Sequence, residues 1–368
     1  MIPVSKPSMG KDELSAISDV LDSGWLGMGS ATYDFEEEIK KIIGCKNVIS
    51  VNTGTSALHI ALEAFGIGKG DEVIVPSITY AAGIQAIINT GASPVFCESQ
   101  EENLLIDVED MKSKITNRTK AVMPVHYCGQ SCDMDEILKI AEENNFFVIE
   151  DAAHAFGSRY KGRMIGSFGH ATCFSFDPIK VISSGEGGAV ALNDDKISEI
   201  IRNKRILGID KETWHRYKNT RAWFYQVTSA GYRYHMPNFC AAMGLVQLKK
   251  LNKFIDKRRK VCLEYDVNFK HLKKIIPLNI NYSETASFAY IVRILNNKRD
   301  MFMSFLQEKN VDTGIHYIPN HLHPFFEKFV NMPLPRSDEL GEQIVTLPLY
   351  YDMTDDNIQS VIKAVIDF

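Results

Sequence analysis

Short apolar runs alternate with amphipathic segments between about residues 35 and 205. Helical spacing of apolar residues predicts helices at residues 35–43, 55–65, 81–91, 107–115 and 133–144. The intervening apolar runs predict strands at residues 47–51, 71–77, 93–98, 120–126, 146–151, 171–176 and 187–193. Because such alternation is typical of parallel strands joined by crossover helices, we predict a three-layer α/β/α domain with a mostly parallel central sheet.

The pattern changes near residue 238, where a long helical stretch without proline begins and continues to residue 269. After it, the pattern predicts a strand at 286–295, a helix at 298–310, a strand at 311–317 and a closing helix at 357–368. We therefore predict a large domain over residues 1–237. Residues 238–368 are expected to form a linking helix and a smaller α+β domain.

Residues 208–237 are polar and rich in aromatic side chains, and they show no clear periodicity. A segment of this length without regular structure is usually functional or mobile, so we expect it to contribute to binding.

Composition excludes several classes of protein. The 46 acidic residues exceed the 41 basic ones, and this net charge of −5 offers no electrostatic footprint for nucleic acid or an anionic membrane. Residues 1–14 lack the apolar core of a signal peptide, and no apolar run approaches the ~20 residues of a membrane helix. The seven scattered cysteines mostly lie in apolar stretches, which favours buried, reduced thiols and a cytoplasmic protein.

Polar side chains that could bind a ligand or take part in catalysis lie where the predicted strands end. Ligands of open α/β sheets bind beyond the carboxyl ends of the strands. Thr55 and Ser56, in the run NTGTSAL, could present hydroxyl and backbone N–H groups to a phosphate, although an N-cap explains them equally well. Asp151 ends the strand at 146–151, where its carboxylate could pair with a protonated heterocyclic nitrogen or cap a helix; His154 follows.

Two further strand ends add a nucleophile and an aromatic ring. Lys180 follows Ser175 and precedes a glycine-rich turn, through which the backbone can approach a bulky planar ligand. A lysine forms a Schiff base only as a neutral amine, so it needs burial or a nearby cation; most lysines are merely solvated charges. Tyr80 could stack on a planar ring or simply belong to the rim.

The order and spacing of these features resemble the DegT/DnrJ/EryC1/StrS family of sugar aminotransferases, nearly from end to end. The runs that carry the resemblance are WLGMGSATYDFEEEI, VNTGTSALHIAL, DEVIVPSITYAA, HYCGQSCDMDEI, EDAAHAFGS, GSFGHATCFSFDPIK, GEGGAV, GYRYHMPNFCAAMGLVQL, the HY-P motif at residues 316–319, and LPLYYDMTDDNI. A chain of ordered motifs is far more specific than any one of them. The resemblance implies the type I (aspartate aminotransferase-like) fold and pyridoxal 5'-phosphate as cofactor, with pyridoxamine 5'-phosphate as its aminated form.

The resemblance also assigns roles to individual residues. Lys180 matches the lysine that holds the cofactor as a Schiff base and then moves protons between the two carbon centres. Asp151 matches the partner of the pyridinium nitrogen, which keeps the ring an electron sink. His154 stands where the family usually has glutamine, at the position that contacts the phenolic oxygen of the ring.

The remaining matched positions concern the phosphate and the ring face. Thr55, Ser56 and Ser175 match the phosphate ligands, and Tyr80 matches the aromatic residue that stacks on the ring. The family builds each site across a homodimer interface. Arg233, where asparagine is common, is implied to reach the phosphate of the neighbouring subunit. The resemblance implies that the loop WLGMGS at residues 25–30 reads the substrate.

We therefore expect an aminotransferase that moves an amino group from an amino acid, with L-glutamate as the expected donor, to a nucleotide-linked keto sugar. A 4-keto-6-deoxyhexose is the expected acceptor, in surface polysaccharide, glycoprotein or antibiotic sugar synthesis. The cofactor motifs do not exclude a 3-keto or non-nucleotide keto sugar, nor a non-catalytic pyridoxal phosphate-binding regulator. His235 and His316 receive no role. His321 and His323 lack accompanying carboxylates or cysteines, so no metal is expected.

Overall fold

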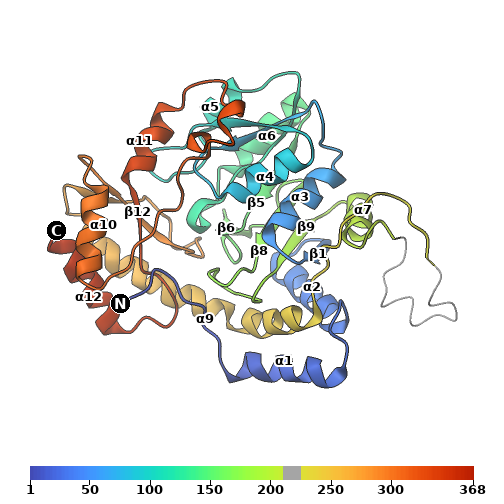
Figure 1. Ribbon diagram of the computed structural model, residues 1–368, viewed down its shortest axis with the longest axis horizontal. Helices are drawn as coiled ribbons and strands as arrows, with labels where there is room; N and C mark the ends of the chain where they lie inside the picture. The colour runs from blue at the N-terminus through green and yellow to red at the C-terminus, as the bar shows by residue number, and fades with distance from the viewer. Residues whose placement is uncertain (210–224) are drawn as a thin grey trace.

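The computed structural model describes residues 1–209 and 225–368, and its central sheet lies between two layers of helices (Figure 1). Among the described residues seven strands form this sheet, in the order β1-β9-β8-β5-β4-β2-β3. Their bounds are β1 (Asn47–Val51), β9 (Gly188–Leu192), β8 (Ala171–Ser175), β5 (Phe147–Asp151), β4 (Thr119–Val122), β2 (Glu72–Pro76) and β3 (Ser93–Cys97). Only β9 runs antiparallel to its neighbours, so the prediction of a mostly parallel sheet is confirmed.

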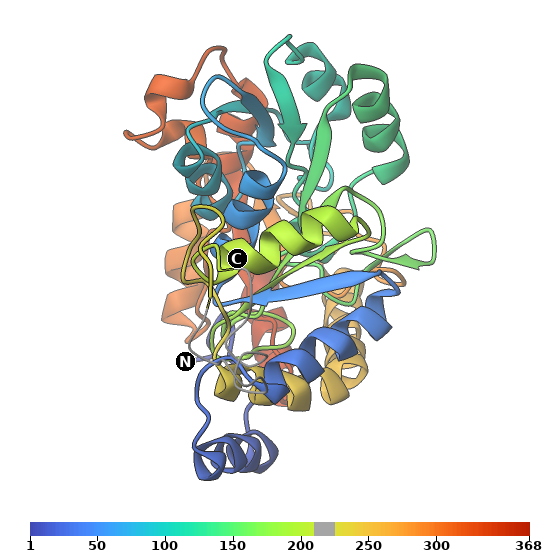
Figure 2. The same ribbon diagram turned by 90° about the vertical axis from the view of Figure 1, so that its right-hand side faces the viewer.

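Helices cover both faces of the sheet. One face packs against α3 (Gly54–Ala64), α4 (Ala81–Asn89) and α7 (Asp195–Arg205). The other face packs against α2 (Ser30–Ile43), α5 (Val108–Ser113), α6 (Met134–Asn144) and the first half of α9 (Asn238–Phe269). Figure 2 shows α7 on one side of β1, with α2 and α9 on the other. The layered arrangement follows from strands that are apolar on both faces.

Helix α9 is the long stretch predicted from residues 238–269, and its bounds agree with that prediction. It runs from the large sheet to a smaller antiparallel sheet of β10 (Ile275–Pro277), β11 (Tyr290–Ile294) and β12 (Ile344–Leu347). Helices α10 (Arg299–Glu308) and α12 (Asp355–Ile366) lie beside this sheet, and α1 (Lys11–Ser23) packs along α9 (Figure 1).

The prediction of a strand at residues 311–317 is wrong. This segment makes only isolated bridges, Ile2 with Val311 and Gly314 with Thr346. β11 pairs with β10 on one side and with β12 on the other, and all four residues of β12 are buried. Residues 316 and 317 leave the sheet and turn towards the cavity described below.

Short elements complete the described chain: α11 (Pro335–Gln343), β6 (Arg159–Tyr160), β7 (Arg163–Met164), η1 (Tyr127–Gly129), η2 (Asn320–Leu322) and η3 (Glu327–Phe329). All seven cysteines are buried and free of disulfides, as predicted. Within the described ranges, no helix is long and apolar enough to cross a membrane. Half of the predicted irregular segment 208–237, residues 210–224, lies outside the described residues.

Candidate active site

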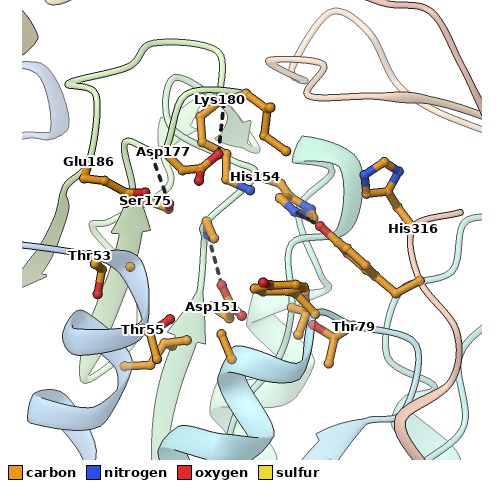
Figure 3. A pocket seen from close by; sticks show the side chains of 18 residues that line it. Thr53, Thr55, Thr79, Asp151, His154, Ser175, Asp177, Lys180, Glu186 and His316 are labelled. Atoms are coloured by element: carbon orange, nitrogen blue, oxygen red, sulfur yellow. Dashed lines mark hydrogen bonds between the residues drawn. The ribbon is translucent and has the colours of Figure 1, made fainter. Parts of the chain in front are cut away.

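Six of the predicted residues line one cavity of about 380 Å³ at the carboxyl ends of β5 and β8. They are Tyr80 and five residues labelled in Figure 3: Thr55, Asp151, His154, Ser175 and Lys180. They come together because parallel strands end at the same edge of the sheet, which is where α/β proteins bind ligands.

One wall of the cavity is the first turn of α3. Thr53 caps this helix by accepting a hydrogen bond from the Ser56 N–H at 3.0 Å. The Gly54 backbone passes so close to Ser175 that a Cβ on Gly54 would lie 2.8 Å from the Ser175 Cβ. A helix N-terminus with free N–H groups and two adjacent hydroxyls, of Thr55 and Ser175, is a natural anion site.

Ser56 does not line this cavity. Its hydroxyl donates to the side-chain oxygen of Asn52 at 2.8 Å and contacts the Thr53 hydroxyl at 2.9 Å. In this chain Ser56 therefore orders the turn that precedes α3.

Asp151 ends β5 and points into the cavity (Figure 3). Burial raises the pKa of its carboxyl group, while the Ala153 N–H, the Lys180 ammonium and His126 act in the opposite direction. The Ala153 N–H donates to one carboxylate oxygen at 3.1 Å. A buried carboxylate with so few partners is suited to a cationic ligand group.

Lys180 reaches the cavity from the turn that follows β8. Burial lowers the pKa of its ammonium group to about 8, although Asp177, Asp151 and Cys128 favour the charged form. Its backbone N–H donates to the Asp177 carbonyl at 3.1 Å. At neutral pH the amine is therefore far more often neutral than that of an exposed lysine, which is the condition for Schiff-base chemistry.

His154 lies between two aromatic residues. It stacks on Phe288 with ring centroids 4.0 Å apart, and its Nε2 lies 3.0 Å from the Tyr317 hydroxyl. Burial, together with Lys180 and His316, lowers its pKa well below the ordinary value, so the imidazole is neutral. Its Nδ1 is buried and has no partner among the described residues, so it remains available to a ligand.

Tyr80 and Arg233 differ in their relation to the cavity. Tyr80 precedes α4 and is 61% exposed, with its ring centroid 5.5 Å from that of Tyr317. Arg233 is exposed and does not line the cavity of this chain; its backbone bridges to Ile206.

Comparison with known proteins identifies the family. Residues 7–366 match the model of the DegT/DnrJ/EryC1/StrS aminotransferase family. The chain belongs to this family. It is 39% identical to the spore coat polysaccharide biosynthesis protein SpsC of Bacillus subtilis, over 100% of this chain and 96% of that protein.

Solved structures agree with this assignment. Spr1654 of Streptococcus pneumoniae in its PMP form has a TM-score of 0.93 at 26% identity, covering 99% of this chain and 98% of that one. PseC of Helicobacter pylori, an aminotransferase involved in pseudoaminic acid biosynthesis, has a TM-score of 0.92 at 26% identity, covering 100% and 98%. Family membership confirms the predicted type I fold and the predicted enzyme class, a pyridoxal phosphate-dependent sugar aminotransferase.

The cavity of this family member fits the cofactor. The α3 N-terminus and Ser175 offer donors to a phosphate, while Asp151 offers a carboxylate to a ring nitrogen. The unpartnered Nδ1 of His154 offers a hydrogen-bonding group to a ring oxygen. Because Gly54 has no side chain, α3 can lie close to Ser175; a side chain at position 54 would fill the space between them.

Sequence reasoning missed several residues of the cavity wall. Thr53, Thr79, Asp177, Glu186 and Tyr317 line it, and so does His316, which had no assigned role. Asp177 lies inside the motif that contains Lys180, so its position alone could have suggested it. His316 and Tyr317 follow α10 in the small-domain part of the chain, and only the tertiary fold brings them here.

Proposed function

We propose that this enzyme transfers the amino group of L-glutamate to the keto carbon of a nucleotide-linked sugar, a 4-keto-6-deoxyhexose being the expected acceptor. The observation that carries the proposal is the convergence of the Lys180 amine, the Asp151 carboxylate and the α3 N-terminus in one cavity. The name of SpsC supports a role in surface polysaccharide synthesis, and the pathway of PseC supports a sugar acceptor.

Each residue has a defined task in this proposal. Lys180 would hold the cofactor covalently, and Asp151 would pair with its ring nitrogen. Thr55 and Ser175 would bind its phosphate, Tyr80 would cover its ring, and His154 would contact its ring oxygen. When bound, the cofactor supplies an electron sink that stabilises negative charge on the carbon losing a proton.

Proton transfer falls to the Lys180 amine. With a pKa of about 8, the side chain can both accept and donate a proton near neutral pH. Neutral His154 cannot compete as an acid, because burial keeps its pKa well below the ordinary value. The same amine would therefore accept the proton that the donor carbon loses in the first half-reaction and donate the proton that the acceptor carbon gains in the second.

The substrate-class test uses purified enzyme, glutamate and a panel of keto sugars. Turnover of a nucleotide-linked 4-keto-6-deoxyhexose, with the new amine located on C4 by NMR, is the expected result. An amine on C3, or turnover of free keto sugars only, would replace the proposed acceptor. Absence of any spectral change with a panel of amino donors would instead favour a non-catalytic binding protein. Lys180→Ala protein is the control and should not turn over.

We also propose a homodimer with shared sites, in which Arg233 binds the cofactor phosphate of the partner subunit. Its exposure, away from the cavity of its own chain, supports this arrangement. Mixing Arg233→Ala with Lys180→Ala protein should restore activity, to about one quarter of the wild-type sites after random subunit exchange. No recovery after proven exchange would count against shared sites.

A further inference from the structure

Phe288, which precedes β11, contacts two residues of the site without lining the cavity itself. The Lys180 Nζ lies over its ring, 4.3 Å from the centroid. His154 stacks against the ring with a centroid distance of 4.0 Å and an interplanar angle of 11°. Phe288 is only 5% exposed, so these two contacts are part of a packed interior.

The backbone of Phe288 is held on both sides. Its N–H donates to the Cys128 carbonyl at 3.3 Å. Its carbonyl accepts from Nη1 of the buried Arg258 at 3.1 Å, and the same Nη1 donates to the Leu349 carbonyl at 3.0 Å. Arg258 belongs to α9, the helix that links the two parts of the chain, so the ring is placed by bonds that do not involve its side chain.

We propose that Phe288 is a positioning residue: its ring holds the Lys180 amine at the cavity wall and keeps the His154 imidazole in the plane in which it meets Tyr317. The proposal rests on the proposed role of Lys180 as the cofactor anchor. It adds a residue that affects the pKa of Lys180. This residue lies in the segment after α9 and belongs to none of the strand-end motifs.

The ring acts on Lys180 in two opposed ways. It excludes water from the amine, which disfavours the ammonium form. Its π face attracts the ammonium group, which favours that form. Other groups that act on this lysine or feel its charge are Asp177, Asp151, Cys128, His154 and His316. Leucine and alanine at position 288 both leave these groups in the sequence, and both remove the ring contacts with His154 and His316. A comparison of the two substitutions can therefore separate the two effects.

Leucine and alanine at position 288 should move the titration of Lys180 in opposite directions. Phe288→Leu keeps an apolar side chain but removes the π face, so the midpoint should fall by about half to one pH unit. Phe288→Ala admits water, so the midpoint should rise by about one pH unit or more, towards that of an exposed lysine. Wild type should titrate near pH 8.

The experiment measures the rate of acetylation of Lys180 in the full-length apoprotein as a function of pH. Mass spectrometry quantifies the Lys180 peptide relative to the peptide of an exposed lysine in the same digest. Phe302→Leu is the matched control, because Phe302 is a fully buried phenylalanine of α10 outside the site. It should lower stability and leave the midpoint unchanged.

The proposal is overturned if the Leu variant has the wild-type midpoint or a higher one, or if the Phe302→Leu control shifts equally. Comparing Leu with wild type also keeps the test valid if the Ala variant does not fold. Borohydride trapping of the cofactor on each variant separates this proposal from the proposed function. Cofactor found on Lys180 with an unchanged midpoint rejects only the role of Phe288, whereas cofactor found elsewhere rejects the anchor itself.

Discussion

Asp177→Asn should make Lys180 a weaker base. Asp177 lines the cavity, and among the groups that favour the ammonium form of Lys180 its carboxylate has the largest effect. Asparagine keeps the side-chain oxygen that accepts from the Ile179 N–H at 3.0 Å, so the local turn should persist. Removing the charge should therefore lower the pKa of Lys180 below its wild-type value.

The magnitude follows from the wild-type pKa. A fall from the ordinary 10.5 to about 8 raises the neutral fraction of the amine at pH 7.5 by about 200-fold. That fall corresponds to about 3 kcal/mol of destabilisation of the ammonium form relative to water. Loss of one nearby opposite charge should move the acetylation midpoint of Lys180 down by about one further pH unit.

The assay is the pH profile of Lys180 acetylation in the full-length apoprotein. Glu186→Gln is the control, because Glu186 lines the same cavity beside Ser175 and is not one of the groups that shift Lys180 (Figure 3). An unchanged or raised midpoint in Asp177→Asn would refute the electrostatic reasoning, as would an equal shift in the Glu186→Gln control.

Three further substitutions test the scaffold of the site. Gly54→Ala should weaken cofactor binding about tenfold or more, because its Cβ would lie 2.8 Å from that of Ser175. Glu36→Gln should lower the free energy of unfolding by about 3–5 kcal/mol, because it leaves buried guanidinium charge without its carboxylate partner. Tyr317→Phe should lower apoprotein stability by about 1–2 kcal/mol, because the Nε2 of His154 loses its partner.

Each of these substitutions has a measurement and a control. Cofactor titration of Gly54→Ala is compared with Gly27→Ala, since no atom lies within 4 Å of a Cβ at Gly27. Equal affinities would contradict the close approach. Thermal and chemical unfolding test the other two, with the exposed Glu37→Gln as the control for Glu36→Gln. Stability equal to wild type in either variant would contradict the corresponding contact.

The Glu36 prediction also has a pH dependence. Burial alone would raise the pKa of this carboxyl group, but the arginine charges and the Ser50 N–H hold it below the ordinary 4.5. A group whose folded pKa is depressed stabilises the protein above its unfolded pKa and loses this effect as the pH falls. The stability difference between wild type and Glu36→Gln should therefore shrink below about pH 4.5. A difference that grows with acidification would contradict this assignment.

Features with local sequence signals were predicted well. Asp151 and Ser175 end buried strands and Lys180 follows one, and the rule that ligands bind at strand ends is enough to bring them together. The long helix from residue 238 to 269 was visible because it has helical spacing and no proline.

Features built from distant segments had no such signal. Phe288 and His316 reach the site only because the segment after α9 packs against the large sheet, a contact that no spacing encodes. The segment 311–317 alternates like a strand, yet β12 takes the place beside β11. Glu36 contacts two arginines of α7, and the more distant in sequence, Arg205, lies 169 residues away in the chain. Such pairings are decided by tertiary packing, not by local propensity.

The most direct test of the central claim is to reduce the purified protein with borohydride after adding pyridoxal phosphate, and to map the modified peptide. We predict a visible Schiff-base absorbance band that disappears on reduction, with the label on the peptide that contains Lys180. No band, or a label on another lysine, would contradict the claim that Lys180 holds the cofactor.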